Sequence, residues 1–170
     1  MLESRASPGS GTLSVEHQRL LRDKLRQVKP RSNRFNRKRR LLSPEQAVAL
    51  RRELCELAAR VRYGGNSEHK RNPGDFGLTP PAGPRPGKSL CDVAGVFTRA
   101  EALSLLRRGL ELGMVSDRFE GIWPFNVWAV TANGIPLEAE WEAEGTYHGY
   151  PMPEQDPFRS VVLERWSTLA

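Results

Sequence analysis

The apolar residues of this 170-residue chain change their spacing once along the sequence. Up to Gly113 they recur at helical spacing, whereas from Val127 onward they alternate with polar residues. Helical spacing predicts amphipathic helices, and alternation predicts strands with one buried face. We therefore expect an α+β fold, in which N-terminal helices pack on a small antiparallel sheet and a short C-terminal helix follows.

Two of the expected helices carry start signals in the sequence. Ser43–Gln46 has the cap, proline and glutamine of a capping box, and the helix that it begins should end at Gly64–Gly65. Thr98–Glu101 is a second capping box, for a helix that should end at Gly113. An earlier helix is expected within residues 14–28, where leucines recur at helical spacing.

The C-terminal part predicts a β-hairpin and one more strand. Asn133–Gly134 suits a tight hairpin turn between strands at Val127–Thr131 and Leu137–Glu142. A third strand is expected through Thr146–His148, and Asp156–Pro157 opens the last helix. The polar half of the second strand should face water, where it can also hold the basic arm. It consists of Glu138, Glu140 and Glu142.

The basic residues are concentrated in the first 40 positions. Residues 1–40 hold 12 Lys and Arg against 3 Asp and Glu, whereas residues 41–170 hold 14 against 17. We expect a basic, partly flexible arm with a helix over 1–40 and a single α+β domain over 41–170. Such an arm binds nucleic acid through phosphates, docks on an acidic protein, or is simply solvated. The arginines expected to contact a nucleic acid are Arg37, Arg39 and Arg40.

Several other protein classes are not indicated. No apolar run approaches the roughly 20 residues that cross a bilayer, and the N-terminus lacks the apolar stretch of a secretory signal. We expect Cys55 and Cys91 to be reduced thiols, because two cysteines make neither a disulfide scaffold nor a zinc site. We expect no metal, no cofactor, no membrane partner and a cytoplasmic location, since ligand clusters and phosphate-binding loops are not found.

Two short polar clusters contain the candidate site residues. His69 lies in Glu68–Gly77, and His148 lies in Thr146–Pro151. Two imidazoles with cations and tyrosines nearby can act as an acid–base pair on a phosphodiester, because histidine exchanges protons near neutral pH. Each histidine also has a structural interpretation, His148 at a strand end and His69 in a solvated loop. The residues expected to assist are Lys70 in catalysis, with Arg71, Tyr147 and Tyr150 in substrate binding.

The stretch His69–Leu78 resembles a segment of colicin D-type toxins, in which lysine and histidine precede an acidic-Phe-Gly turn. Helices that precede a small antiparallel sheet also resemble the wider barnase, EndoU, colicin and RelE-like group of metal-independent ribonucleases. The resemblance implies RNA cleavage in a cleft lined by the sheet. His69 would match the motif histidine and Lys70 its lysine, in reversed order and at shorter spacing.

Two functions follow from these features. The first is a metal-independent endoribonuclease of the toxin or defence type, with RNA and an inhibitor or other acidic protein as partners. The second is a non-enzymatic adaptor that binds nucleic acid or protein. In the adaptor the contact surface would be the proline-rich loop at residues 72–90 and the patch Tyr147–Tyr150.

Overall fold

The computed structural model describes residues 36, 38–83 and 89–169 of the chain. The chain divides into two units, residues 1–34 and 35–170, and every described residue belongs to the second. The helix expected within residues 14–28 and the candidate Arg37 therefore lie outside the described residues. Arg39 and Arg40, which the sequence assigns to the arm, belong to the same unit as the sheet.

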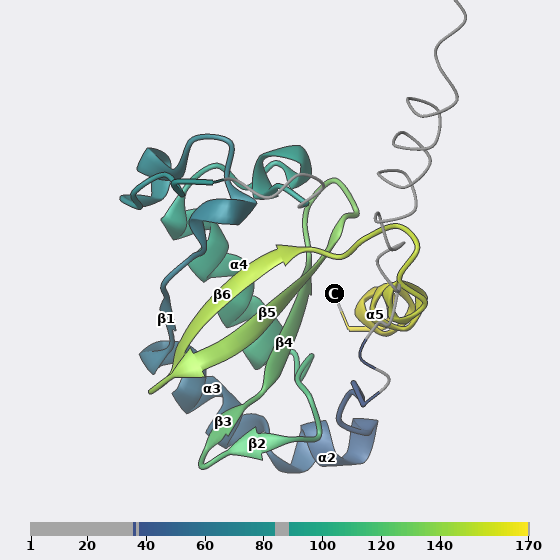
Figure 1. Ribbon diagram of the computed structural model, residues 1–170. Coiled ribbons are helices and arrows are strands. Elements are labelled where there is room, and N and C mark those ends of the chain that lie inside the picture. The colour runs from purple at the N-terminus through teal and green to yellow at the C-terminus, as the bar shows by residue number, and fades with distance from the viewer. Residues whose placement is uncertain (1–35, 37, 84–88, 170) are drawn as a thin grey trace, which may run out of the picture. The chain divides into compact units, whose positions relative to one another are not determined.

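The described unit combines helices with a curled sheet, so the predicted α+β class is confirmed (Figure 1). The helices are α2 (Pro44–Ala49), α3 (Arg51–Arg60), α4 (Arg99–Glu111) and α5 (Phe158–Ser167). The strands are β1 (Arg62–Tyr63), β2 (Phe119–Glu120), β3 (Trp123–Pro124), β4 (Asn126–Val130), β5 (Pro136–Ala143) and β6 (Thr146–Pro151). Among the described residues, no helix is long and apolar enough to cross a bilayer.

Both predicted capping boxes are present. The Ser43 side chain accepts a hydrogen bond from the backbone N–H of Gln46, and Thr98 does the same for Glu101 at the start of α4. The helix predicted to begin after Ser43 is divided, however, because Leu50 has a non-helical ψ of 9°. This residue ends α2 and precedes α3, so one continuous helix becomes two.

The main sheet has the strand order β1-β6-β5-β4. Strands β4, β5 and β6 are antiparallel neighbours, and the hairpin expected around Asn133–Gly134 joins β4 to β5. Strand β1 pairs with β6 in the parallel direction and was not expected. It contains only Arg62–Tyr63, which is too short to give a periodic signal, and its pairing depends on a partner more than 80 positions away in the sequence.

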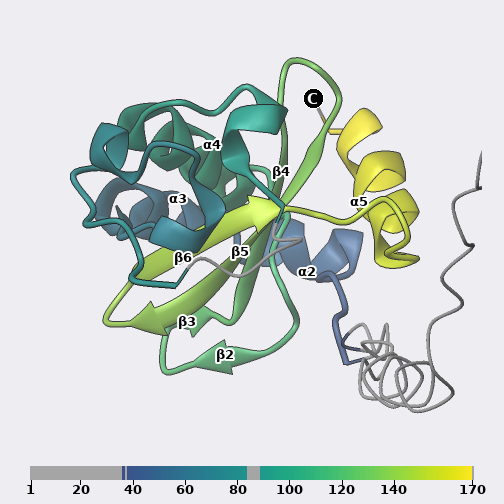
Figure 2. The same ribbon diagram turned by 45° about the horizontal axis from the view of Figure 1, so that its top comes forward.

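Helices cover the two faces of the sheet unequally. Helices α3 and α4 pack on one face, while α5 packs on the β4 end of the other (Figure 2). Helix α4 comes very close to β4 at Gly109, where a Cβ atom would lie 2.5 Å from the carbonyl oxygen of Trp128. Among the residues that the structure describes, no α-helix covers the rest of the second face, toward β6 (Figure 1). Polar side chains on that part of the sheet can therefore reach the surface.

Candidate functional site

The two polar clusters that contain His69 and His148 meet in the folded chain. His69 ends the 3₁₀ turn Ser67–His69, and its ring stacks on the ring of Tyr150 in β6, with centroids 5.1 Å apart. His69 is 6% exposed, and its Nδ1 lies 2.8 Å from the carbonyl oxygen of Ser89. Because a carbonyl only accepts hydrogen bonds, Nδ1 carries the proton in this contact. Segments about 80 residues apart in the sequence thus form one corner.

Strand alternation places His148 and Tyr150 on the face of β6 that α4 does not cover. His148 lies opposite Glu140 of β5, with 3.8 Å between its Nε2 and Oε2 of Glu140. Its Nδ1 lies 3.0 Å from Oε1 of Glu142, a close contact whose angle is too bent for a hydrogen bond. The hydroxyl of Tyr150 donates to Oε1 of Glu140 at 2.7 Å. We call this cluster of Glu140, Glu142, His148 and Tyr150 the open face.

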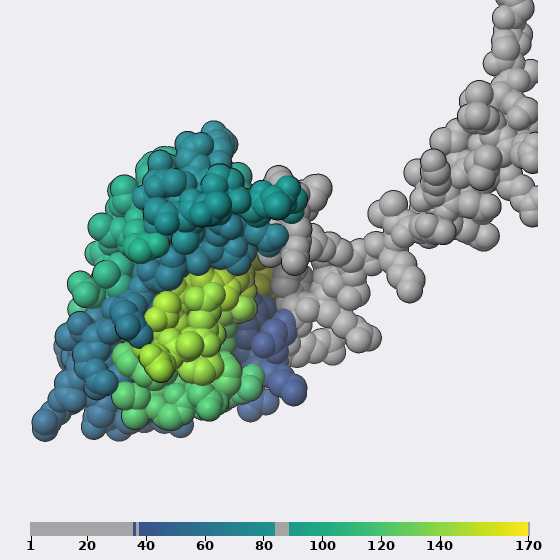
Figure 3. Space-filling model, turned by 60° about the vertical axis from the view of Figure 1, so that its left-hand side comes forward, coloured from purple at the N-terminus to yellow at the C-terminus, as the bar shows by residue number. Residues whose placement is uncertain are grey.

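The open face is accessible to a ligand. The side chain of His148 is 18% exposed, and those of Glu140 and Glu142 are each 45% exposed. In Figure 3 this part of the sheet, in yellow-green, lies at the surface between blue and teal segments from earlier in the chain. A histidine between two carboxylates, with a tyrosine beside it, can exchange protons with a bound substrate. The carboxylates were expected to be solvated, and their pairing with His148 was not anticipated.

Tyr147 lies on the opposite face of the same strand, where it belongs to the core. Its side chain is fully buried, and its hydroxyl donates to the carbonyl oxygen of Pro124 at 2.6 Å. Burial also raises the pKa of this phenol above its ordinary value. Of the two tyrosines expected to bind substrate, only Tyr150 is therefore on the same face as His148. The period of a strand explains the difference, because residues three positions apart point to opposite faces.

Lys70 is held inside the fold instead of facing a substrate. It is 5% exposed, and its ammonium group lies 4.6 Å from the centre of the Phe76 ring. The ammonium donates to Oδ1 of Asp92 at 3.1 Å and to the carbonyl oxygens of Val96 and Phe97. Three acceptors satisfy the three N–H donors of a lysine. Lys70 thus links its loop to the segment before α4 through these hydrogen bonds. The neighbouring Arg71 is exposed.

Arg39 is also engaged within the fold. Its guanidinium bonds both carboxylate oxygens of Asp156, at 2.8 and 2.7 Å, and Oε2 of Glu138 at 2.6 Å. The second oxygen of Glu138 accepts from Nδ2 of Asn126 at 2.9 Å. We call Arg39, Glu138 and Asp156 the buried ion triad. Two expectations are corrected here. Glu138 was expected to face water but is 1% exposed, and Arg39 was expected to contact a nucleic acid but binds carboxylates of its own chain. The neighbouring Arg40 is exposed.

The pH dependence of stability should report on Glu138. Burial raises the pKa of this carboxyl to about 7, although Arg39 acts in the opposite direction. The unfolded chain releases this proton near its ordinary pKa of 4.5, so between pH 4.5 and 7 the folded chain binds more protons. The free energy of unfolding should therefore fall as pH rises through this window, by up to about 3 kcal/mol.

Glu138→Gln should remove this part of the slope, because the amide does not titrate. Urea unfolding at a series of pH values measures it. Glu164→Gln, which removes an exposed carboxyl from α5, controls for the loss of one charge. An unchanged slope in Glu138→Gln would show that another group causes the pH dependence.

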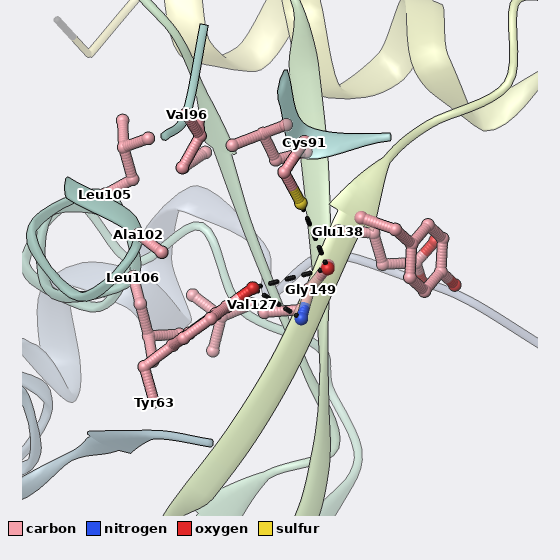
Figure 4. A pocket seen from close by; sticks show the side chains of 13 residues that line it. Tyr63, Cys91, Val96, Ala102, Leu105, Leu106, Val127, Glu138 and Gly149 are labelled. Atoms are coloured by element: carbon pink, nitrogen blue, oxygen red, sulfur yellow. Dashed lines mark hydrogen bonds between the residues drawn. The ribbon is translucent and has the colours of Figure 1, made fainter. Parts of the chain in front are cut away.

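A small cavity lies between α4 and the sheet, on the face away from His148. Its volume is about 30 Å³, enough for about one water molecule and too small for a substrate. Figure 4 shows Tyr63, Cys91 and Gly149 at its wall, where the backbone N–H of Gly149 donates to the Tyr63 hydroxyl at 3.0 Å. Burial raises the pKa of Cys91 to about 11, so its thiol stays protonated at neutral pH. The cavity is therefore part of the core.

No family model, curated protein or solved structure matches this chain. In the part of the chain that the structure describes, no three His, Cys, Asp or Glu side chains are arranged to hold a metal ion. The open face, where His148 lies between two exposed carboxylates beside Tyr150, is the strongest candidate for a functional site among the described residues.

Proposed function

We propose that the protein is a metal-independent endoribonuclease that cleaves RNA at the open face. The observation that supports this most directly is the position of His148 between Glu140 and Glu142, beside Tyr150. Carboxylate and imidazole are the two side-chain types that most readily act as base and acid near neutral pH. A base and an acid on one accessible sheet face supply the two proton transfers that cleavage of RNA without a metal needs.

In the proposed reaction Glu140 is the base and His148 is the acid. Glu140 takes the proton of the ribose 2′-hydroxyl, and the 2′-oxygen attacks the adjacent phosphorus. The bond from phosphorus to the 5′-oxygen breaks, and His148 in its protonated form gives a proton to that oxygen. The products are a 2′,3′-cyclic phosphate and a free 5′-hydroxyl. Each proton transfer of this kind accelerates a reaction by about 100- to 10,000-fold.

The neighbouring residues have positioning roles in this proposal. Glu142 lies 3.0 Å from Nδ1 of His148 and so helps to hold the imidazole ring in place beside Glu140. Tyr150 donates to Glu140 and so orients the base. His69, which is 6% exposed, supports Tyr150 through the stacked rings and acts through it instead of touching the phosphate. This assignment replaces the pairing of His69 with His148 as acid and base.

The charge distribution supports RNA as the partner. Residues 1–40 carry a net charge of +9, whereas residues 41–170 carry −3. A polyanion would be attracted to the first segment by long-range electrostatics and counterion release. The same asymmetry favours the second candidate function, a non-enzymatic protein that binds nucleic acid through these residues.

A cleavage assay separates the two functions. We expect the purified chain to cut single-stranded RNA in the presence of a chelator and to leave 2′,3′-cyclic phosphate ends. The same sequence made of 2′-O-methyl RNA should bind but remain intact, because its 2′-oxygen cannot attack. Intact RNA under all conditions, with binding retained, would contradict the nuclease and favour the adaptor.

A further inference from the structure

A groove lined by arginines runs along β1, at the edge of the main sheet. It lies between the strand and α4 and has a volume of about 700 Å³. Four arginines line it and no carboxylate does; they are Arg60, Arg62, Arg99 and Arg107. This concentration of positive charge is unexpected in residues 41–170, where acidic residues outnumber basic ones by 17 to 14. We call it the arginine groove.

One wall of the arginine groove is a row on α4. Arg99 and Arg107 are eight residues apart, with Leu103 midway, so they lie on the same side of the helix about 12 Å apart along its axis. Both arginines are exposed. Within the described residues neither has a carboxylate within 4.0 Å, although Arg99 donates weakly to the carbonyl oxygen of Gly64 at 3.3 Å. The charge of this wall is therefore not neutralised by an ion pair of its own.

The opposite wall follows the end of α3 and the start of β1. The guanidinium of Arg60 lies over the Trp123 ring, 5.8 Å from its centre. Arg62 donates to the carbonyl oxygen of Glu144 at 2.9 Å, and its nearest carboxylate, also of Glu144, is exposed and 3.9 Å away. An exposed pair of this length is weak and can exchange for another anion. All four arginines can thus receive an anionic ligand.

The arginine groove leads to the open face. Thr146 lines the groove and lies on the same face of β6 as His148, about 7 Å along the strand. At the same place, a Cβ on Gly64 would lie within 3.3 Å of both the Thr146 side chain and Oε2 of Glu142. The open face itself contributes two carboxylates and, among its four residues, no arginine or lysine. A phosphodiester bound at the open face therefore needs cations from a neighbouring surface, and the arginine groove is the adjacent surface that has them.

We propose that the arginine groove binds the phosphate backbone of the RNA strand on one side of the cleavage position. The inference rests on the proposed ribonuclease function and adds the path of its substrate. Arginine suits this task, since its planar guanidinium donates to two phosphate oxygens at once and stays charged at all relevant pH values. The phosphates are recognised and the bases are not, so the groove binds single-stranded RNA without a sequence preference.

Binding to an RNA that cannot be cleaved tests the groove. The probe is a short, fluorescein-labelled 2′-O-methyl RNA, and its anisotropy is measured with the full chain in chelator over a range of salt concentrations. Arg107→Gln should weaken binding, and Arg99→Gln/Arg107→Gln should weaken it by about tenfold or more at low salt. Each lost phosphate contact should reduce the magnitude of the slope of log affinity against log salt by about 0.7, so the double variant, which loses two contacts, should show a reduction of about 1.4.

Arg108→Gln is the matched control, because it removes the same charge from the next position of α4, which is exposed and outside the groove. We expect it to keep nearly the affinity of the unaltered chain. Equal losses in Arg107→Gln and Arg108→Gln would overturn the inference, since only overall charge would then matter. Unchanged RNA affinity in the double variant would also overturn the inference. If the double variant kept its RNA affinity but lost binding to poly-glutamate, a probe for acidic proteins, the groove would instead be a protein-docking surface.

The outcomes for the groove and for the nuclease remain distinguishable. If the unaltered chain does not cleave RNA but the double variant loses affinity for the probe, the proposed function fails and the groove stands. If the chain cleaves RNA and the double variant binds the probe normally, the function stands and the groove inference fails. A thermal melt of each variant confirms that these exposed substitutions leave the fold intact.

Discussion

His148→Gln is expected to lower the rate of RNA cleavage by about 100- to 10,000-fold. In the proposed reaction His148 supplies the proton to the leaving 5′-oxygen, and glutamine has no proton to give at neutral pH. The side chain is 18% exposed and belongs to no apolar cluster, so its replacement should not unfold the chain. Single-turnover cleavage of an RNA with one labelled end measures the effect.

Two comparisons make this result specific. His17→Gln is the same substitution at the remaining histidine of the chain, outside the two clusters, and should keep full activity. Binding of the 2′-O-methyl probe to His148→Gln should be close to that of the unaltered chain, because the imidazole acts on the transition state. A loss of activity below about threefold, well short of the effect of a general acid, would exclude His148 from catalysis.

Arg39→Met is expected to reduce the free energy of unfolding by about 3 to 5 kcal/mol. The substitution leaves Glu138 and Asp156 in the interior without their shared cation, and both are less than 5% exposed. It also removes a contact with the ring of Phe158, over which the guanidinium lies at 5.1 Å. Urea unfolding followed by tryptophan fluorescence measures the loss.

The cause of this loss can be separated from a general loss of charge. Arg40→Met changes the adjacent, exposed arginine and should alter stability by less than about 0.5 kcal/mol. Glu138→Gln introduced into Arg39→Met should recover part of the stability, because it removes one of the two unpaired carboxylates. A simple sum of the two single effects would mean that Arg39 and Glu138 do not interact energetically.

The sequence predicts the elements whose signals are local. Both capping boxes and the Asn133–Gly134 hairpin are set by residues within a few positions of each other, and all three are present. The break at Leu50 and the parallel strand β1 were not predicted. Strand β1 exists because β6 offers it a partner, and a partner distant in the sequence leaves no periodic pattern in a two-residue strand.

The candidate site was predictable in part. Alternation alone places His148 and Tyr150 on one face and Tyr147 on the other. Glu140 could not have been placed opposite His148 by counting back from the tight turn between β5 and β6, where Glu144 and Gly145 both have positive φ. That count pairs Trp141 with His148, whereas a register shift between Trp141 and Ala143 moves the pairing by one residue and brings Glu140 opposite His148. The engagement of Lys70 and Arg39 could not be predicted, because their partners lie 22 and up to 117 positions away.

The short strand β1 also affects how the protein behaves at high concentration. A sheet that ends in a long apolar strand offers unpaired backbone groups to other molecules and tends to aggregate. Here the last strand has two residues, of which Arg62 is the first, and Arg60 ends the helix just before it. A second molecule therefore finds little backbone to pair with and meets like charge. The arginines that we assign to RNA binding would thus also keep the protein monomeric at this border.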